Sequence, residues 1–313
     1  MEVNMANIAA KDVAALRAKT GIGMMECKKA LVEADGDVDA AIKILREKGE
    51  LKAQSKIANR IAADGVVDIM KEGDVTAMIE VNSETDFVAK NEKFQEFVKA
   101  LLKTVIANKP ADVEALMTSK YIDGDVTVDE KLKEMIFVIG EKISIRRFVV
   151  VDGTTSTYIH GAGSIGVIAK FDTDVADAEG FAEFAKNIAL QIGAYPTPYI
   201  TREDVPASVI EGEKEIIKAQ LANDPKMAGK PEKVLDGIIM GKIGKYYEAN
   251  CLVDMDYVKE DGMKVGKYIE NTAKALGGKI AVVEVCRFEK GEGIQKKEED
   301  FASEIEKLAN GNK

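Results

Sequence analysis

A glycine-rich hexapeptide is the first stretch whose residue types and spacing could support a cofactor site. Residues 161–166 are Gly-Ala-Gly-Ser-Ile-Gly, which matches the GxGxxG pattern of dinucleotide-binding proteins letter for letter. In such proteins a helix begins at the glycines, and its N-terminal N–H groups hold the pyrophosphate. Here residues 166–171 continue as an apolar strand pattern. The pattern therefore favours a hairpin turn over an oxidoreductase that uses this segment.

The other chemical motifs are incomplete. Residues 237–242 lack one residue of a phosphate-binding P-loop and fall within a helical periodicity. Residues 35–39, Asp-Gly-Asp-Val-Asp, begin like a calcium loop, but Ala40 and Arg46 replace its glycine and its bidentate glutamate, so a helix cap is expected. With one histidine, His160, and three scattered cysteines, a His-rich metal site is impossible. We therefore expect no metal, no cofactor and no covalent catalysis.

Residues 85–91, Thr-Asp-Phe-Val-Ala-Lys-Asn, place an acid beside a large aromatic side chain, between a predicted strand end and a predicted helix start. Two interpretations stay open. In the first, Asp86 caps a turn and Phe87 fills the local core. In the second, both side chains are exposed, and an apolar wedge next to an anion separates packed elements of a partner protein. The exposure of Phe87 distinguishes the two.

Hydrophobic periodicity predicts the elements that position these segments. Residues 7–49 predict a bundle of three short helices, and residues 66–81 predict a strand hairpin. A helix with one apolar face follows at residues 94–105. The same order recurs as two strands within residues 157–169 and a helix at 181–192, which indicates a duplicated strand-strand-helix core.

Two polar helical segments, residues 206–221 and 233–247, carry a narrow apolar stripe with charged flanks. This pattern is typical of an inserted antiparallel helical hairpin that projects from the body of a protein. The complete set of elements predicts an α+β fold. The remaining predicted elements are a helix at 132–137, a strand at 143–150, a helix at 264–276, a strand at 279–285 and a helix from about 297.

The composition limits the classes of partner. Among 313 residues, 44 Lys and Arg stand against 54 Asp and Glu, a net charge of −10, and no long basic run is present. Such a charge repels phosphate backbones, so no direct nucleic-acid ligand is expected. The apolar runs are far shorter than the ~18 residues of a membrane span, so no membrane partner is expected. The dispersed cysteines and the lack of a secretory signal pattern favour a cytoplasmic location.

Five ordered and individually unusual segments together carry a resemblance that spans almost the whole chain. They are residues 16–31, 85–90, 139–143, 160–162 and 287–294. In these segments the chain closely resembles the bacterial elongation factor Ts family, the guanine nucleotide exchange factors of the GTPase elongation factor Tu. The resemblance implies an N-terminal bundle like a ubiquitin-associated domain and a C-terminal helical module. It also implies a factor that binds elongation factor Tu and promotes GDP release without chemistry of its own.

The resemblance also assigns residues. Thr85, Asp86, Phe87 and Val88 match the family segment that disturbs the Mg²⁺ site of the GTPase. Because Mg²⁺ neutralises the phosphates of GDP, its displacement speeds nucleotide release. The resemblance implies these further partner contacts: Arg17, Met24, Met25, Ile139, Gly140, Glu141 and His160. Two alternatives stay open: Met24 and Met25 pack in the core, and His160 has only a structural role in its turn.

The expected organisation has five parts. They are a bundle and linker at 1–58, a core N-subdomain at 59–151, a core C-subdomain at 152–199 and 249–289, the hairpin at 200–248, and a C-terminal module at 290–313. The implied partner is elongation factor Tu, both GDP-bound and nucleotide-free, and the hairpin or the core is a candidate surface for a homodimer. A helical-hairpin scaffold that only tethers partners is the alternative function. Residues 110–130 and 251–262 depart from the commonest family pattern and leave the domain edges open.

Overall fold

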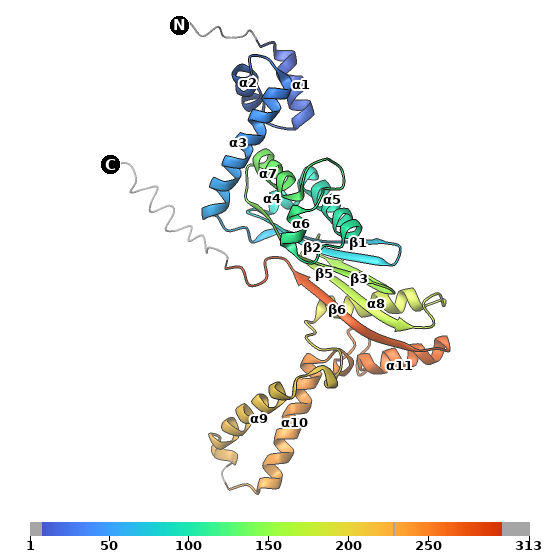
Figure 1. Cartoon of the computed structure of the whole chain (residues 1–313). Coiled ribbons are helices and arrows are strands. Elements are labelled where there is room, and N and C mark those ends of the chain that lie inside the picture. Colours follow the sequence, from blue (N-terminus) through green and yellow to red (C-terminus); the bar gives the residue numbers. More distant parts are fainter. Residues whose placement is uncertain (1–7, 228, 296–313) are drawn as a thin grey trace. The chain divides into compact units, whose positions relative to one another are not determined.

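The computed structural model of the chain describes residues 8–227 and 229–295 (Figure 1). Within these residues, helices and two three-stranded sheets form a mixed fold, which confirms the predicted α+β class. The first of two compact units consists of the described residues within 1–70, 79–148 and 289–313. The second consists of those within 71–78 and 149–288.

The N-terminal bundle contains α1 (Ala10–Thr20), α2 (Met24–Glu33) and α3 (Val38–Asn59). The side chain of Asp37 accepts hydrogen bonds from two backbone N–H groups of α3, so the segment that begins like a calcium loop is a helix cap. Helix α3 continues about ten residues past the expected bundle, because strong helix formers follow Gly49. The buried core of the bundle is Val13, Leu16, Ile22, Cys27, Ala30, Leu31, Ala41 and Leu45.

The first sheet has the order β1-β2-β3. Its strands are β1 (Asp64–Glu72), β2 (Val75–Ser83) and β3 (Ile143–Asp152). Strands β1 and β2 form the predicted hairpin, and Gly73 takes the positive φ of its turn. The chain leaves β2 directly into the 85–91 segment, so the end of a buried strand fixes where that segment begins.

Four helices lie between β2 and β3, namely α4 (Asp86–Ala89), α5 (Glu92–Asn108), α6 (Val113–Thr118) and α7 (Val128–Ile139). The predicted apolar face of α5 is buried. The 110–130 segment, left open by its sequence, is ordered: Thr127 and Glu130 form a capping box that starts α7. Tyr121 in this segment is buried and stacks on Phe97, with the ring centroids 6.2 Å apart.

The second sheet has the order β4-β5-β6, with β4 (Thr155–His160), β5 (Ile165–Thr173) and β6 (Ile280–Glu289). Strands β4 and β5 pair antiparallel, with His160 opposite Ile165. Helices α8 (Phe181–Ala194) and α11 (Val265–Leu276) pack on this sheet through a common apolar cluster. The order β4-β5-α8 repeats β1-β2-α5, except that α4 precedes α5 in the first copy.

Helices α9 (Ala207–Ala222) and α10 (Glu232–Asn250) lie side by side as the predicted hairpin (Figure 1). Four buried side chains form its seam: Ile217, Leu221, Ile239 and Ile243. Short 3₁₀ turns precede, separate and follow the two helices: η1 (Arg202–Asp204), η2 (Pro225–Met227) and η3 (Leu252–Asp254). The narrow seam shows that most of the hairpin surface stays exposed to solvent.

The 251–262 region after the hairpin is held by α8. The side-chain amide of Gln191 donates to the carbonyl of Asp256 at 3.1 Å and accepts from the N–H of Val258 at 2.8 Å. A fully buried side-chain amide thus satisfies one backbone carbonyl and one backbone N–H of the loop. The helix predicted from about residue 297 lies outside the described residues. None of the described helices combines the length and the apolar character needed to cross a bilayer.

Candidate partner-binding site

The 85–88 segment forms the N-cap, Thr85, and the start of a single helical turn, α4 (Asp86–Ala89). Phe87 is 79% exposed, the largest exposed fraction among the large apolar side chains described. Val88 points the other way and is only 6% exposed. The interpretation in which Phe87 fills the local core is therefore wrong, because the tertiary fold buries its neighbour instead.

Asp86 lies next to the exposed ring and carries a negative charge. The Lys90 ammonium donates to its carboxylate at 2.7 Å, one helical turn away. This hydrogen bond, together with the positive charges of Lys90 and Lys290, holds the pKa of Asp86 below its ordinary value. The tip of the turn thus combines an anion with an apolar ring. Asp86 does not cap the turn as the first interpretation had it, since Thr85 occupies the N-cap position.

Thr85 is tied to the end of α7 by the carboxylate of Glu141. The Thr85 backbone N–H donates to Glu141 Oε2 at 3.1 Å, and its hydroxyl donates to Oε1 at 2.9 Å. Helix α7 ends at Gly140 with φ 85°, a left-handed conformation that glycine adopts without strain. The predicted 139–141 segment is therefore brought to the 85–88 segment, although 56 residues separate Thr85 from Glu141.

A second glutamate, Glu84, connects the same two segments from the other side. The backbone N–H of Lys142 donates to Glu84 Oε1, and the Arg60 guanidinium donates to Glu84 Oε2 at 2.9 Å. The Lys142 ammonium in turn donates to the carbonyl of Arg60 at 2.8 Å. The sequence analysis gave no role to Glu84, Arg60 or Lys142, because no local pattern indicates a contact between segments so far apart.

Close to this region, a buried carboxylate holds the 289–292 segment. Glu80 is fully buried on β2, and its oxygens accept from Gly291 N–H at 2.8 Å, Arg146 Nη1 at 3.0 Å and Arg147 Nε at 2.7 Å. Burial raises the pKa of Glu80, but the hydrogen bonds from Gly291, Asn82 and Arg147 outweigh it and leave the pKa below the ordinary value. The segment is therefore fixed to the sheet by a charged group.

The predicted contacts in the bundle are all on the surface. Arg17 is exposed on α1. Met24 is 50% exposed and Met25 is 65% exposed, both in the first turn of α2. Core packing of these two methionines, the alternative left open by their helical spacing, is wrong.

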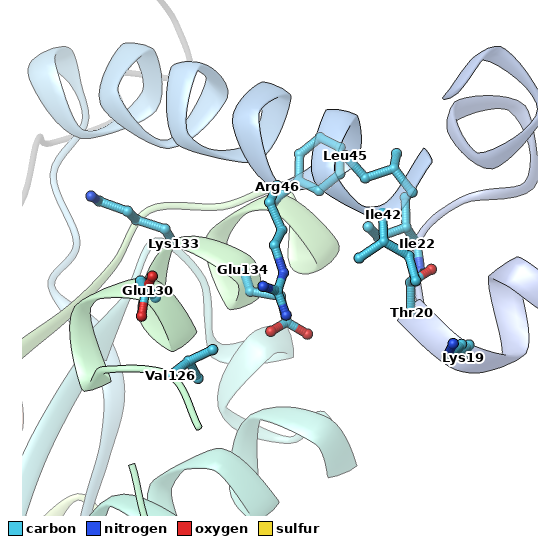
Figure 2. A pocket seen from close by; sticks show the side chains of 11 residues that line it. Lys19, Thr20, Ile22, Ile42, Leu45, Arg46, Val126, Glu130, Lys133 and Glu134 are labelled. Carbon is cyan, nitrogen blue, oxygen red and sulfur yellow. The ribbon is translucent and has the colours of Figure 1, made fainter. Parts of the chain in front are cut away.

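A cavity of about 240 Å³ opens between the bundle and α7 (Figure 2). Its apolar wall comes from the bundle and from Phe137, and charged side chains surround it. The sequence gives no signal for this cavity, because it exists only where α7 packs against α3. The lining residues are Lys19, Thr20, Ile22, Ile42, Leu45, Arg46, Val126, Glu130, Lys133, Glu134 and Phe137.

His160 ends β4 in the second unit and is exposed. The Tyr158 hydroxyl is 2.8 Å from His160 Nδ1, which fixes the ring orientation. The glycine-rich segment after it forms a turn, and β5 begins at Ile165. The hairpin interpretation is therefore confirmed, and the oxidoreductase alternative loses the helix N-terminus that it requires. Among the described residues, no three His, Cys, Asp or Glu side chains gather as a metal site would need.

Comparison with known proteins assigns the family. The protein-family model described as Elongation factor TS matches residues 84–292, which include the 85–88 turn, Glu141, His160 and the Glu80-bound 289–292 segment. Elongation factor Ts of Syntrophotalea carbinolica is 44% identical over 95% of this chain and 98% of its own length. Elongation factor Ts of Clostridium kluyveri is 44% identical, and that of Clostridioides difficile 43%, each over 97% of this chain and 99% of the relative. The chain belongs to the elongation factor Ts family.

In this member of the elongation factor Ts family, the first unit carries most of the predicted site. It contains Arg17, the two exposed methionines, the 85–88 turn and the 139–141 segment, whereas His160 lies in the second unit. Of these residues, the turn and Glu141 are in direct contact. The family assignment makes the chain a translation elongation factor, in agreement with the resemblance on which it was first predicted.

Proposed function

We propose that the chain is the guanine nucleotide exchange factor of elongation factor Tu. The observation that carries the proposal is the exposure of Phe87 beside the charged Asp86 on a turn whose two ends are held. An aromatic side chain in contact with water is a typical anchor for a partner protein. The proposal involves no covalent step, so the chain acts by binding alone.

The mechanism follows from how a GTPase holds GDP. Mg²⁺ and ordered switch segments neutralise and enclose the phosphates, so whatever displaces them speeds GDP release. In the proposal the Phe87 ring inserts between packed elements near the Mg²⁺ site, and Asp86 competes for the polar groups there. GTP then reloads the emptied site. By linkage, the chain weakens nucleotide binding by the same factor by which nucleotide weakens binding of the chain.

The other surfaces have supporting roles in the proposal. Arg17, Met24 and Met25 hold the bundle to the GTPase, and His160 adds a contact from the second unit. Exposed methionines suit this role because their flexible side chains adapt to a partner surface. The proposal includes binding to the GDP-bound and nucleotide-free forms, a cytoplasmic location, and the five-part organisation with a bundle like a ubiquitin-associated domain. Self-association through the hairpin or the core also stays a prediction.

The test is release of a fluorescent GDP analogue from purified elongation factor Tu, with and without the chain. Acceleration at micromolar concentration supports the proposal, and no acceleration overturns it. Binding without acceleration would support the scaffold alternative instead. The variant Phe87→Ala, measured in parallel, separates the action of the exposed ring from an effect of binding elsewhere.

A further inference from the structure

The 85–88 turn is held by a reciprocal pair of hydrogen bonds. Glu141 accepts from the backbone N–H of Thr85, and Glu84 accepts from the backbone N–H of Lys142. Each glutamate thus binds the residue that adjoins the other glutamate in the sequence. We call this arrangement of Glu84, Thr85, Glu141 and Lys142 the glutamate clamp.

The hydroxyl of Thr85 binds Glu141 in place of the usual N-cap hydrogen bond within α4. Thr85 occupies the N-cap position of α4, where a threonine oxygen commonly accepts from an N–H of the helix's first turn. Its side chain makes no such bond. The hydroxyl donates to both oxygens of Glu141 instead, at 2.9 and 3.2 Å. The start of α4 is therefore oriented from α7 and not by its own cap.

The exposed ring depends on this external support. With 79% of Phe87 in contact with solvent, its own packing cannot fix its direction. Buried Val88 holds the turn on one side. Thr85 is a second attachment: Glu141 accepts from its backbone N–H and hydroxyl, and the Ser83 hydroxyl donates to its carbonyl at 2.9 Å. Without Glu141 the start of the turn loses its connection to the segment after α7, so the direction of the Phe87 ring is less restricted.

We propose that Glu141, which the resemblance implied as a partner contact, is instead a positioning residue that acts through Thr85 and does not itself contact the GTPase. Its carboxylate holds the turn so that Phe87 and Asp86 face the partner in one orientation before binding. This lowers the ordering cost of association, because the turn is organised in the free chain. The inference rests on the proposed function, since it concerns how the same site is presented.

Hydrogen exchange of the free chain tests the clamp without the GTPase. The amides of Thr85 and Asn91 report on it, because the first donates to Glu141 and the second to the carbonyl of Val88. In Glu141→Ala both should exchange about fivefold faster or more, the loss expected for a hydrogen bond of ordinary strength. Glu114→Ala, an exposed glutamate on α6, is the matched control and should change neither amide. Unchanged exchange in Glu141→Ala would overturn the inference.

Two variants of Thr85 keep the test valid if Glu141→Ala folds poorly. Thr85→Val removes the hydroxyl donor and keeps the shape of the side chain, so it should speed exchange of the same amides. Thr85→Ser restores the hydroxyl and should return them to near wild-type rates. Equal rates in the valine and serine variants would show that the hydroxyl bond to Glu141 does not hold the turn.

A double-mutant cycle with Phe87→Ala decides whether Glu141 acts through the turn. Glu141→Ala should slow GDP release about fivefold in the wild-type background and cause little further loss when Phe87 is already alanine. An equal loss in both backgrounds would show that Glu141 touches the GTPase directly, and would overturn the inference. If the wild-type chain does not accelerate release at all, the proposed function fails, while hydrogen exchange still decides whether the clamp holds the turn.

Discussion

The backbone N–H of Gly291 donates a hydrogen bond of 2.8 Å to the buried carboxylate of Glu80, 211 residues earlier in the chain. Arg146 and Arg147 on β3 bind the same carboxylate. Two arginines, the Asn82 amide and one backbone N–H thus satisfy a charge that burial would otherwise disfavour. This single side chain links β2, β3 and the segment after β6 within the first unit.

Replacing Glu80 should therefore reduce stability strongly. Glu80→Gln removes the buried negative charge that Arg146 and Arg147 both bind, and we expect a loss of about 2 to 4 kcal/mol in the free energy of unfolding. Urea unfolding monitored by circular dichroism measures it. Glu72→Gln, an exposed glutamate on β1, removes the same charge and should cost less than about 0.5 kcal/mol. Similar losses in the two variants would contradict the buried network.

The same carboxylate predicts how stability depends on pH. Its pKa in the folded chain lies below the ordinary value of 4.5, so the unfolded chain takes up a proton first as the pH falls. The stabilisation is complete above about pH 4.5 and is lost progressively below it. Urea midpoints measured from neutral to acid pH should fall less steeply in Glu80→Gln than in the wild type. If the urea midpoint falls equally steeply with pH in both proteins, other carboxylates cause the acid sensitivity.

A substitution at Phe87 should impair nucleotide exchange, whereas one at the neighbouring Val88 should impair stability. Phe87→Ala should slow nucleotide exchange more than about tenfold, the loss of a hot spot, and leave the melting temperature nearly unchanged because the ring is exposed. Val88→Ala should lower the free energy of unfolding by about 1 to 2 kcal/mol, because it leaves a space in the core. A low melting temperature for Phe87→Ala, with exchange intact below it, would contradict this assignment.

The hairpin of α9 and α10 should be dispensable for folding. Its buried seam consists of side chains from the hairpin itself, so most of its contacts are internal. Replacing residues 206–247 with a short Gly/Ser turn should leave a cooperatively folding protein that still releases GDP. An insoluble product would show that the division into domains is wrong, and a folded product without exchange activity would show that the hairpin is part of the exchange site.

The predictions from sequence succeeded where burial follows a local period. The apolar face of α5, the β1-β2 hairpin and the α9-α10 pair depend on side chains three, four or two positions apart, and each is present. The exposure of Phe87 could not be predicted, because it depends on which face of a single turn meets the core. The pairs Thr85–Glu141 and Glu80–Gly291 join distant segments, and only the fold brings them together.

The chain and GDP should each weaken the binding of the other to elongation factor Tu. The direct measurement is the dissociation constant of the chain for elongation factor Tu, determined by titration calorimetry without nucleotide and again with saturating GDP. We expect the chain to bind the nucleotide-free form at least about tenfold more tightly, and we expect a smaller ratio of the two dissociation constants for Phe87→Ala. Equal affinity for both forms would contradict it, because a protein that binds both states equally cannot shift nucleotide release.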